Sequence, residues 1–480
     1  MITIKIDAKK KHKISPYLYM QFMEPLSATD TSVDAGWDYT KNEWYPSLIE
    51  KVKELSPTMV RFGGTFAAYY HWKEAIGEQK DRIPMINHCW GGLYSNAVGT
   101  DEVIDFCRQV EAEPLLVVNT ESDGFDIWAN PRGDGNRLGI AEEAAEWVDY
   151  CNNPENPLRR KNGTENPFNV KYWQIGNETS YKICTGVGFK LDECYDVTNR
   201  FAEKMRNVDP DIKLIGWGDR SYDDVNWCKR MSEIESIDML AFHHHFGGEK
   251  YGRLYGNDYR LDSEKTWEIL MSAHEDLDEH IKTMRADCGN KRLALTEGHF
   301  ILAGRNRNEI LSSWAAGVAY ARCLNTIMRH SDVLDIATMA DFFGNVWQVN
   351  AILIPGALKW EHFKPYLQPV GSVMSLFKKH QGEYTLDINY NGNIDAVASA
   401  TDNKIFIHIA NLNMNSSNEI TFDLGDKKAK KIKMHYITEN PTTEVTMLNP
   451  DIFAPKTIES QNLNFKLPAA AVAAIEIEVE

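Results

Sequence analysis

The sequence predicts an α/β fold, a (β/α)8 barrel, followed by a C-terminal antiparallel β-sandwich domain. Between about residues 14 and 380, short β-type runs alternate with helical patterns, which is typical of a parallel sheet covered by helices. From Gln381 onward, apolar and polar residues alternate at period two, and no helical pattern intervenes. Polar residues also stand where the apolar runs of the first region stop, and catalytic groups of such barrels lie at those strand ends.

The barrel prediction depends on the number of its strands. Eight βα units over this length match the (β/α)8 barrel, also called the TIM barrel. The eight predicted strands are Tyr17–Phe22, Met59–Gly63, Leu115–Asn119, Val170–Asn177, Lys213–Gly216, Met239–His243, Leu293–Glu297 and Ile336–Ala340. Helical periodicity predicts covering segments at Glu102–Glu111, Ala141–Cys151, Cys194–Asn207, Ser263–Met284 and Ser312–His330.

The C-terminal region predicts a separate sheet. Asn, Gly and Pro separate its period-two runs, as in an antiparallel sandwich. Met1–Asp7 alternates in the same way, so we expect this N-terminal strand to join the C-terminal sheet. The predicted domains are therefore a catalytic barrel at residues 14–380 and a sandwich made of residues 1–13 plus 381–480. The clearest sandwich strands are Lys404–Ile409, Glu419–Leu424, Lys431–Tyr436 and Leu463–Leu467.

Composition narrows the class of function. The chain has 480 residues and a formal net charge of −17, which disfavours binding to nucleic acid or to anionic membranes. No run of about 18 apolar residues predicts a membrane-spanning helix, and Met1–Asp7 lacks the apolar core of a secretory signal. The eight cysteines include no Cys-x-x-Cys pair. These features predict a cytoplasmic protein with reduced thiols and no membrane partner.

Two glutamates stand at the ends of predicted strands that face each other across the barrel. Glu178 follows strand four in a Gly-Asn-Glu sequence, and Glu297 ends strand seven in a Thr-Glu-Gly sequence. Arg61 ends strand two, and His243 to His245 end strand six. A lone strand-end glutamate is usually a helix cap or a salt-bridge partner. Two facing carboxyl groups in this setting indicate glycosidic bond cleavage, where one donates a proton and the other attacks the sugar.

The motifs follow one another in the order of a known family. The chain resembles glycoside hydrolase family 51, the α-L-arabinofuranosidases, over almost its whole length. The shared segments are Ile14–Glu24, Val60–Trp72, Trp90–Gly92, Ala144–Asn152, Val170–Glu178, and Asn325–Thr326 with Arg329–His330. Gly-Asn-Glu alone is common among related glycosidases, so the specificity comes from the ordered set.

The resemblance implies a retaining exo-glycosidase that needs neither a cofactor nor a metal. It implies that Glu178 is the acid/base, that Glu297 is the nucleophile and that Asn177 hydrogen-bonds the sugar 2-hydroxyl. It further implies terminal furanose release and a homo-oligomer. The expected cytoplasmic location predicts an oligosaccharide substrate, since polymers do not enter cells. Glu24 and Arg61 are expected to line the sugar pocket, and His243 to position the carboxylates.

Several positions depart from the family pattern, and all of them surround the sugar. Thr65 replaces an expected asparagine, His245 replaces a tyrosine, and the segment near Asp341 lacks an expected glutamine. The loop Glu121–Gly139 is longer than expected. The same mechanism on a β-D-galactofuranoside, a β-xyloside or a β-glucoside therefore stays open.

Two other classes of function compete with this reading. Thirteen tryptophans and the sandwich would suit a carbohydrate-binding protein without catalysis, although the paired glutamates argue against it. A nicotinamide enzyme needs a longer glycine-rich loop than Gly63-Gly64. The run His243-His244-His245 suggests a metal site, but alternation along a strand lets at most two of the three converge. We therefore expect no catalytic metal.

Overall fold

The computed structural model describes residues 1–26, 32–121, 138–181, 189–219, 226–254, 258–301, 309–355, 364–460 and 462–480. Most of the long loop Glu121–Gly139, including Trp128, lies outside the described residues, as does Cys184.

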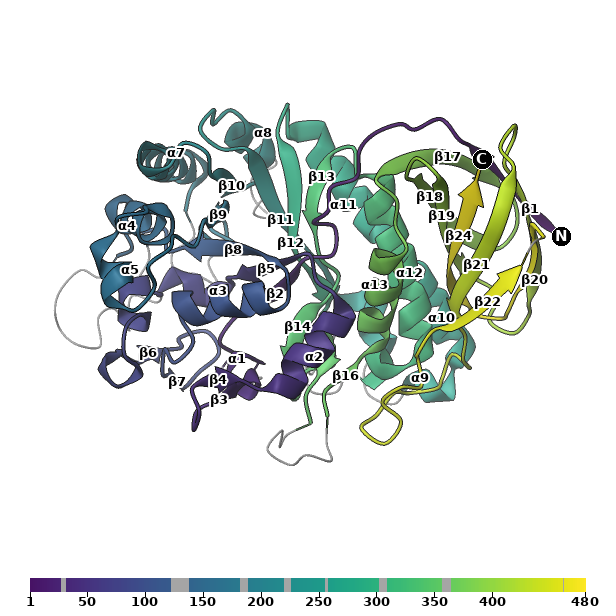
Figure 1. The fold of residues 1–480 in the computed structure, drawn as a ribbon, viewed down its shortest axis with the longest axis horizontal. Coiled ribbons are helices and arrows are strands. Elements are labelled where there is room, and N and C mark those ends of the chain that lie inside the picture. The colour runs from purple at the N-terminus through teal and green to yellow at the C-terminus, as the bar shows by residue number, and fades with distance from the viewer. Residues whose placement is uncertain are drawn as a thin grey trace.

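A curled sheet of eight parallel strands forms the larger part of the molecule (Figure 1). Hydrogen bonds close the barrel between its first and last strands, because Met20 N donates to Ala337 O at 2.9 Å and Ala337 N donates to Tyr17 O at 3.0 Å. The (β/α)8 prediction is confirmed. In sheet order the strands are β13 (Leu334–Ala337), β12 (Arg292–Phe300), β11 (Met239–Phe246), β10 (Lys213–Trp217), β9 (Tyr172–Ile175), β8 (Glu113–Val118), β5 (Met59–Phe62) and β2 (Gln21–Met23).

Each of these strands overlaps a predicted run, but some bounds differ. Strand β2 is shorter than the predicted Tyr17–Phe22, since Tyr17 makes only an isolated bridge to Ile336. Strands β11 and β12 are longer than predicted and stay paired as far as Phe246 and Phe300. The extra pairing carries histidines of both strands beyond the main barrel wall, toward the predicted site.

Amphipathic helices cover the outside of the barrel. The predicted segment Ser263–Met284 is two helices, because the chain turns at Ser272 between them. The Asp262 side chain caps the first of the two by accepting a hydrogen bond from Lys265 N at 3.0 Å. The larger helices are α2 (Pro46–Leu55), α3 (Thr100–Gln109), α4 (Ala141–Asn152), α7 (Leu191–Val208), α10 (Ser263–Met271), α11 (Ala273–Asp287), α12 (Trp314–Arg329) and α13 (Pro369–Lys379). None of the described helices combines the length and apolar character that crossing a lipid bilayer requires.

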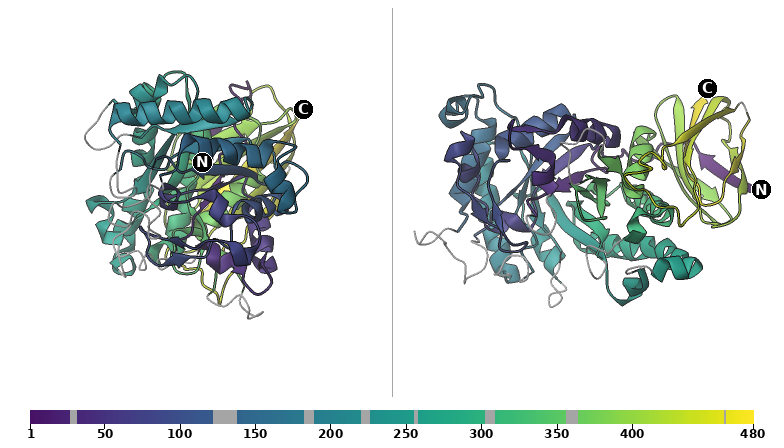
Figure 2. Two further views of the ribbon diagram at one scale, coloured as in Figure 1. Left: turned by 90° about the vertical axis from the view of Figure 1, so that its left-hand side faces the viewer. Right: turned by 90° about the horizontal axis from the view of Figure 1, so that it is seen from below.

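The second body is a nine-stranded β-sheet whose members are almost all antiparallel. The N-terminal strand β1 (Ile2–Asp7) lies inside it, antiparallel to β17 and parallel to β20. Both termini consequently lie at the same end of the elongated molecule (Figure 2). The domain boundaries after residues 13 and 380 stay a prediction. The other strands are β17 (Tyr384–Tyr390), β18 (Ile394–Ala400), β19 (Lys404–Asn411), β20 (Asn418–Asp423), β21 (Ala429–Ile437), β22 (Lys456–Ser460), β23 (Asn464–Leu467) and β24 (Val472–Val479).

Helices α12 and α13 join the two bodies. Helix α12 is buried along nearly its whole length and is rich in alanine, which lets neighbouring elements approach it closely. At its C-terminal end, Asn325 and Arg329 donate hydrogen bonds to the buried Asp395 carboxylate of β18, at 2.7 and 2.8 Å. At its start, the Trp314 indole donates to Ala470 O at 2.7 Å. The sandwich therefore packs against the side of the barrel, along α12 from its start to its C-terminal end.

Candidate active site

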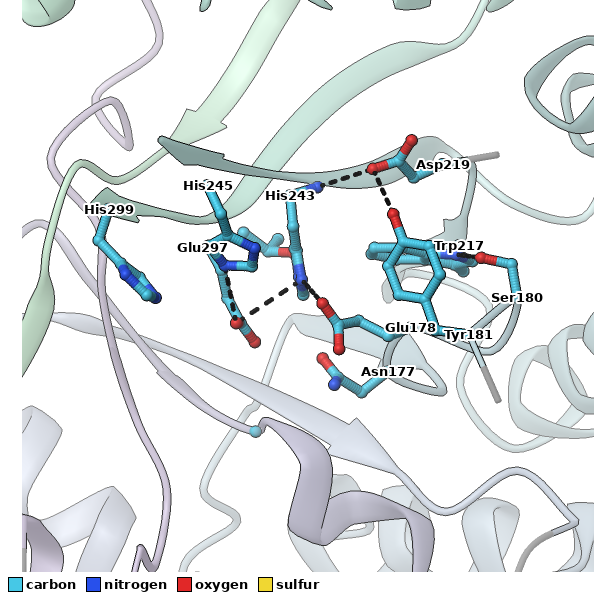
Figure 3. A network of polar contacts seen from close by, with 12 residues as sticks. Asn177, Glu178, Ser180, Tyr181, Trp217, Asp219, His243, His245, Glu297 and His299 are labelled. Atoms are coloured by element: carbon cyan, nitrogen blue, oxygen red, sulfur yellow. Dashed lines mark hydrogen bonds and ion pairs between the residues drawn. The ribbon is translucent and has the colours of Figure 1, made fainter. Parts of the chain in front are cut away.

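The two predicted glutamates approach each other from opposite sides of one histidine (Figure 3). Glu178 lies in the turn after β9, and Glu297 lies within β12. Between them is His243 of β11, whose Nδ1 atom is 2.8 Å from Glu178 Oε1 and 3.6 Å from Glu297 Oε2. All three side chains are buried. One ring nitrogen therefore faces both carboxylates.

The other face of His243 is also held. Its Nε2 atom lies 3.0 Å from the Thr296 hydroxyl, and the Trp217 ring meets it edge-on at 4.6 Å between centroids. The Trp217 indole in turn donates to Ser180 Oγ at 2.8 Å. Contacts from β10, from β12 and from the turn after β9 thus fix the orientation of the imidazole.

Arg61 connects the carboxylate of Glu297 to the turn that carries Glu178. Its guanidinium is fully buried and donates to Glu297 Oε1 at 2.9 Å and to Gln174 Oε1 at 3.0 Å. The same group donates to Asn177 Oδ1, next to Glu178 in the chain. An arginine presents several donors in a rigid plane, so it can hold these acceptors in one fixed arrangement.

Glu24 fills the space that a glycine leaves open. A Cβ atom on Gly64 would lie 2.3 Å from the Glu24 carboxylate, so only glycine permits this approach. Phe66 N donates to Glu24 Oε2 at 3.3 Å. Burial raises the pKa of Glu24 well above its usual range, and the nearby Glu297 carboxylate raises it further, against the lowering effects of the Phe66 hydrogen bond and Arg61.

The backbone before Glu178 makes a tight left-handed turn. Gly176 has φ +73°, and a Cβ there would meet Thr179 and Thr120 side-chain atoms at 2.5 and 2.8 Å. Glu178 itself has φ +50°, a conformation that residues with side chains rarely adopt. Strain of this kind is typical of functional sites, where the surrounding contacts hold the side chain in place.

A second row of polar groups extends from the Glu297 side. His245 Nε2 is 3.8 Å from Glu297 Oε2, and the His299 ring lies 4.6 Å from the His245 ring. His299 Nε2 is 3.3 Å from Asp341 Oδ1. Asp341 therefore joins the site through His299. Thr65 is buried at the start of a short 3-10 helix, and within the described residues its side chain has no hydrogen bond or ion pair.

The structure adds residues that the sequence analysis did not name as site residues. Asp219 lies two residues after the end of β10, and its Oδ2 atom accepts hydrogen bonds from the Tyr181 hydroxyl at 3.3 Å and from His243 N at 3.5 Å. Its position at a strand end was the available signal, because strand-end residues are the ones that reach the barrel mouth. Three further residues contact predicted ones: Thr296 contacts His243, Gln174 contacts Arg61 and His299 contacts Asp341.

His244, the middle histidine of the run, points away from the carboxylates, as strand alternation requires. Its Nδ1 atom lies 3.1 Å from His280 Nδ1 on α11, and burial with the neighbouring His280 lowers its pKa to about 3. The two flanking histidines and Glu297 each place one potential metal ligand within 4.8 Å of the others. A second group of this kind, His380, His435 and Glu476, lies on the sandwich side.

Family comparisons cover both bodies of the molecule. An α-L-arabinofuranosidase 1 domain model matches residues 51–265, and an α-L-arabinofuranosidase C-terminal domain model matches residues 298–471. The chain belongs to glycoside hydrolase family 51. The first match includes Glu178. The second match begins one residue after Glu297, so Glu297 lies between the two matched regions.

Relatives of this family 51 chain match it over nearly its full length or over about half of it. It is 26% identical to an intracellular exo-α-L-arabinofuranosidase of Bacteroides ovatus, over 99% of this chain and 95% of that protein. It is 32% identical to an α-L-arabinofuranosidase C of Emericella nidulans, but over 48% of this chain and 46% of that protein.

Solved structures share the fold from end to end. An α-L-arabinofuranosidase from Thermotoga maritima, solved as an arabinose complex, has a TM-score of 0.77 at 23% identity and full coverage of both chains. A family 51 α-L-arabinofuranosidase from Bifidobacterium longum has a TM-score of 0.82 at 19% identity, with 99% of both chains covered. The agreement extends over the barrel and the sandwich together.

Proposed function

We propose that this chain is a retaining exo-α-L-arabinofuranosidase that releases terminal arabinofuranose from oligosaccharides. The observation that carries the proposal is the single His243 nitrogen between the two carboxylates. Since Glu178 Oε1 lies 2.8 Å and Glu297 Oε2 3.6 Å from it, these oxygens are at most about 6.4 Å apart, whereas inverting glycosidases need roughly 6.5–9.5 Å and retaining ones about 5–5.5 Å. The names of the relatives supply the sugar.

In the first step, a Glu297 oxygen attacks the anomeric carbon while Glu178 gives its proton to the leaving glycosidic oxygen. The C–O bond to the aglycone breaks, and a covalent glycosyl ester on Glu297 forms. Arg61 holds Glu297 Oε1 at 2.9 Å, which leaves Oε2 as the oxygen that faces the His243 side of the site. The fixed arginine thereby selects the orientation of the nucleophile.

In the second step, the Glu178 carboxylate removes a proton from water, and the oxygen of that water attacks the anomeric carbon. The ester bond breaks, and Glu297 regains its negative charge. His243 lies 2.8 Å from Glu178, so it can keep the Glu178 carboxyl group aligned while that group loses and regains its proton.

Five further residues are proposed to bind the sugar or shape its pocket. Asn177 is fixed by Arg61 and is the residue next to the acid/base, so its amide is placed to bond the sugar 2-hydroxyl. The raised pKa of Glu24 favours a protonated carboxyl group, which can donate a hydrogen bond to a sugar hydroxyl. His245 and Asp341, together with Thr65, are proposed to shape the same side of the pocket.

The test is hydrolysis of an aryl α-L-arabinofuranoside together with other aryl furanosides and pyranosides. Glu297→Gln is expected to lose activity by several powers of ten, and azide is expected to restore turnover to the small-side-chain variant Glu178→Ala. Glu113→Gln, at the first position of β8 and thus at the opposite end of a barrel strand, is the matched control and should keep full activity. A product of inverted configuration would contradict the mechanism, and cleavage of another glycoside alone would contradict the sugar.

The cellular location and the assembly state are separate proposals with their own tests. The relatives named as intracellular support a cytoplasmic location, which cell fractionation checks. The homo-oligomer is a proposal carried over from the family, and light scattering coupled to size-exclusion chromatography measures it.

A further inference from the structure

Three potential metal ligands converge at the mouth of the barrel. His243 Nδ1 lies 3.6 Å and His245 Nε2 lies 3.8 Å from the same atom, Glu297 Oε2 (Figure 3). The two histidines are alternate residues of β11, so their side chains leave the strand on one face. The neighbouring strand β12 supplies the carboxylate that the histidine run lacks by itself.

The spacing of these atoms suits a small divalent ion. The two histidine nitrogens lie within 4.8 Å of each other, so a point equidistant from all three atoms is at most about 2.4 Å from each. Zinc binds histidine nitrogen and carboxylate oxygen at about 2.0–2.2 Å. Shifts of a few tenths of an ångström therefore complete the site. Two histidines and one glutamate form a known donor set for zinc, with the fourth position left for water.

We propose that His243, His245 and Glu297 form a binding site for a divalent transition metal ion of the zinc class. The ion binds Glu297 Oε2, the oxygen that is proposed to attack the sugar. It therefore acts as a reversible inhibitor and not as a cofactor. The binding half of this inference rests on geometry alone, and the inhibition half rests on the proposed function.

Neighbouring groups prepare the ligands for such an ion. A histidine ligand usually donates its other ring N–H to an acceptor, and the Thr296 hydroxyl lies 3.0 Å from His243 Nε2. Arg61 engages Glu297 Oε1, which keeps Oε2 available on the histidine side. Glu178 competes with the ion for His243 Nδ1, because its Oε1 atom is 2.8 Å away. Binding should therefore weaken as the pH falls and protons compete for the same atoms.

The sandwich group His380, His435 and Glu476 is the rival site. Its two rings are stacked at 4.0 Å with planes only 15° apart, so their in-plane nitrogen lone pairs run side by side and do not meet at one ion. The Lys404 ammonium group is 3.2 Å from Glu476 Oε2 and opposes a cation, as the Arg61 guanidinium does at the barrel mouth, so the ring geometry is what distinguishes the two groups. His380 Nδ1 is already 2.7 Å from Glu476 Oε1. This group provides the matched control.

The experiment measures Zn²⁺ binding by the whole chain, purified with a chelator and dialysed free of it. Isothermal titration calorimetry should give one ion per chain, and Co²⁺ in its place should give the visible absorption of a four- or five-coordinate site. His245→Phe and Glu297→Gln should each weaken binding at least about tenfold. His435→Phe should bind Zn²⁺ as the unaltered chain does.

The outcomes separate the two sites and the two proposals. No Zn²⁺ binding, or binding lost in His435→Phe but kept in His245→Phe, would overturn the inference. Inhibition that falls as substrate rises and that EDTA reverses would support the inhibitory role. A chain that binds Zn²⁺ through His245 but hydrolyses no glycoside would leave the metal site standing and refute the proposed function.

Discussion

Arg61→Met is the substitution for which the structure gives the most definite expectation. The arginine is fully buried and donates to Glu297, Asn177 and Gln174. Methionine keeps an unbranched apolar side chain of similar length but removes every donor. Glu297 then keeps a buried negative charge without its cation. Glu24 loses the Arg61 charge that lowers its pKa, while the Glu297 charge that raises its pKa stays.

Removing one partner of a buried ion pair costs about 3–5 kcal/mol of unfolding free energy, because the remaining charge is left uncompensated. The loss should shrink when Glu297 is neutral. In a Glu297→Gln background, Arg61→Met removes only hydrogen bonds to neutral acceptors, at roughly 1 kcal/mol each after solvent exchange. The bonds to Asn177 and Gln174 are lost in both backgrounds and cancel in a double-mutant cycle. The ion-pair cost less roughly 1 kcal/mol for the bond to the substituted side chain therefore leaves a coupling free energy of about 2–4 kcal/mol between the two positions.

Urea unfolding followed by tryptophan fluorescence gives the four free energies of this cycle, and far-UV circular dichroism checks that each variant folds. Lys265→Met, on the exposed side of α10 where Lys265 pairs with Glu268 at 2.7 Å, is the control and should change stability by less than about 1 kcal/mol. Additive effects of Arg61→Met and Glu297→Gln would refute the reasoning, since they would mean that the arginine does not compensate the nucleophile's charge.

Three further outcomes follow from the described contacts. Gly64→Ala should raise KM more than it lowers kcat, because its Cβ would lie 2.3 Å from the Glu24 carboxylate, and steady-state kinetics on the aryl substrate would contradict this if KM stayed unchanged. Burial lowers the pKa of His408 to about 4, below its ordinary 6.5, so the unfolded chain takes up a proton first and stability falls from about pH 6.5 down to pH 4, by roughly 3 kcal/mol. His408→Gln should flatten that dependence in urea titrations at several pH values, and an unchanged slope would assign the acid sensitivity to other groups. Deleting residues 1–7 removes β1 from between β17 and β20, so the sandwich should melt several degrees earlier in calorimetry while an intact N-terminal strand with Lys5→Ala should not.

The barrel was predictable because its signal is repeated along the chain. Eight apolar runs separated by helical periodicity restrict the topology even where each boundary is uncertain, and the bounds of β5 and β10 differ from the predicted runs by a single residue. The first strand was predicted less well, since Tyr17 to Met20 closes the barrel with only a few hydrogen bonds. The break at Ser272 has no strong local signal, because the apolar pattern of α10 continues into α11.

The central residues of the site were predictable from strand ends, but their connections were not. Strand position indicates that Glu178, Glu297 and Arg61 reach the same mouth, and the structure brings them together. Sequence cannot specify that one His243 nitrogen faces both carboxylates, since that depends on rotamers and on the register of β11 against β12. The Glu297 ligand of the proposed metal site lies on the neighbouring strand, so the spacing of the histidine run could not predict it.

The shared histidine explains how two like charges can work in sequence at one site. In the proposed mechanism, the negative charge of Glu297 keeps on Glu178 the proton that is given to the leaving group. Once Glu297 is esterified, that charge is gone, and Glu178 can stay ionised and accept a proton from water. The coupling requires the two groups to be close and screened from water, and burial of both carboxylates around His243 provides this. Arg61 contacts Glu297 directly but is linked to Glu178 through Asn177, so it stabilises the Glu297 charge without cancelling the interaction on which the proposed exchange of roles depends.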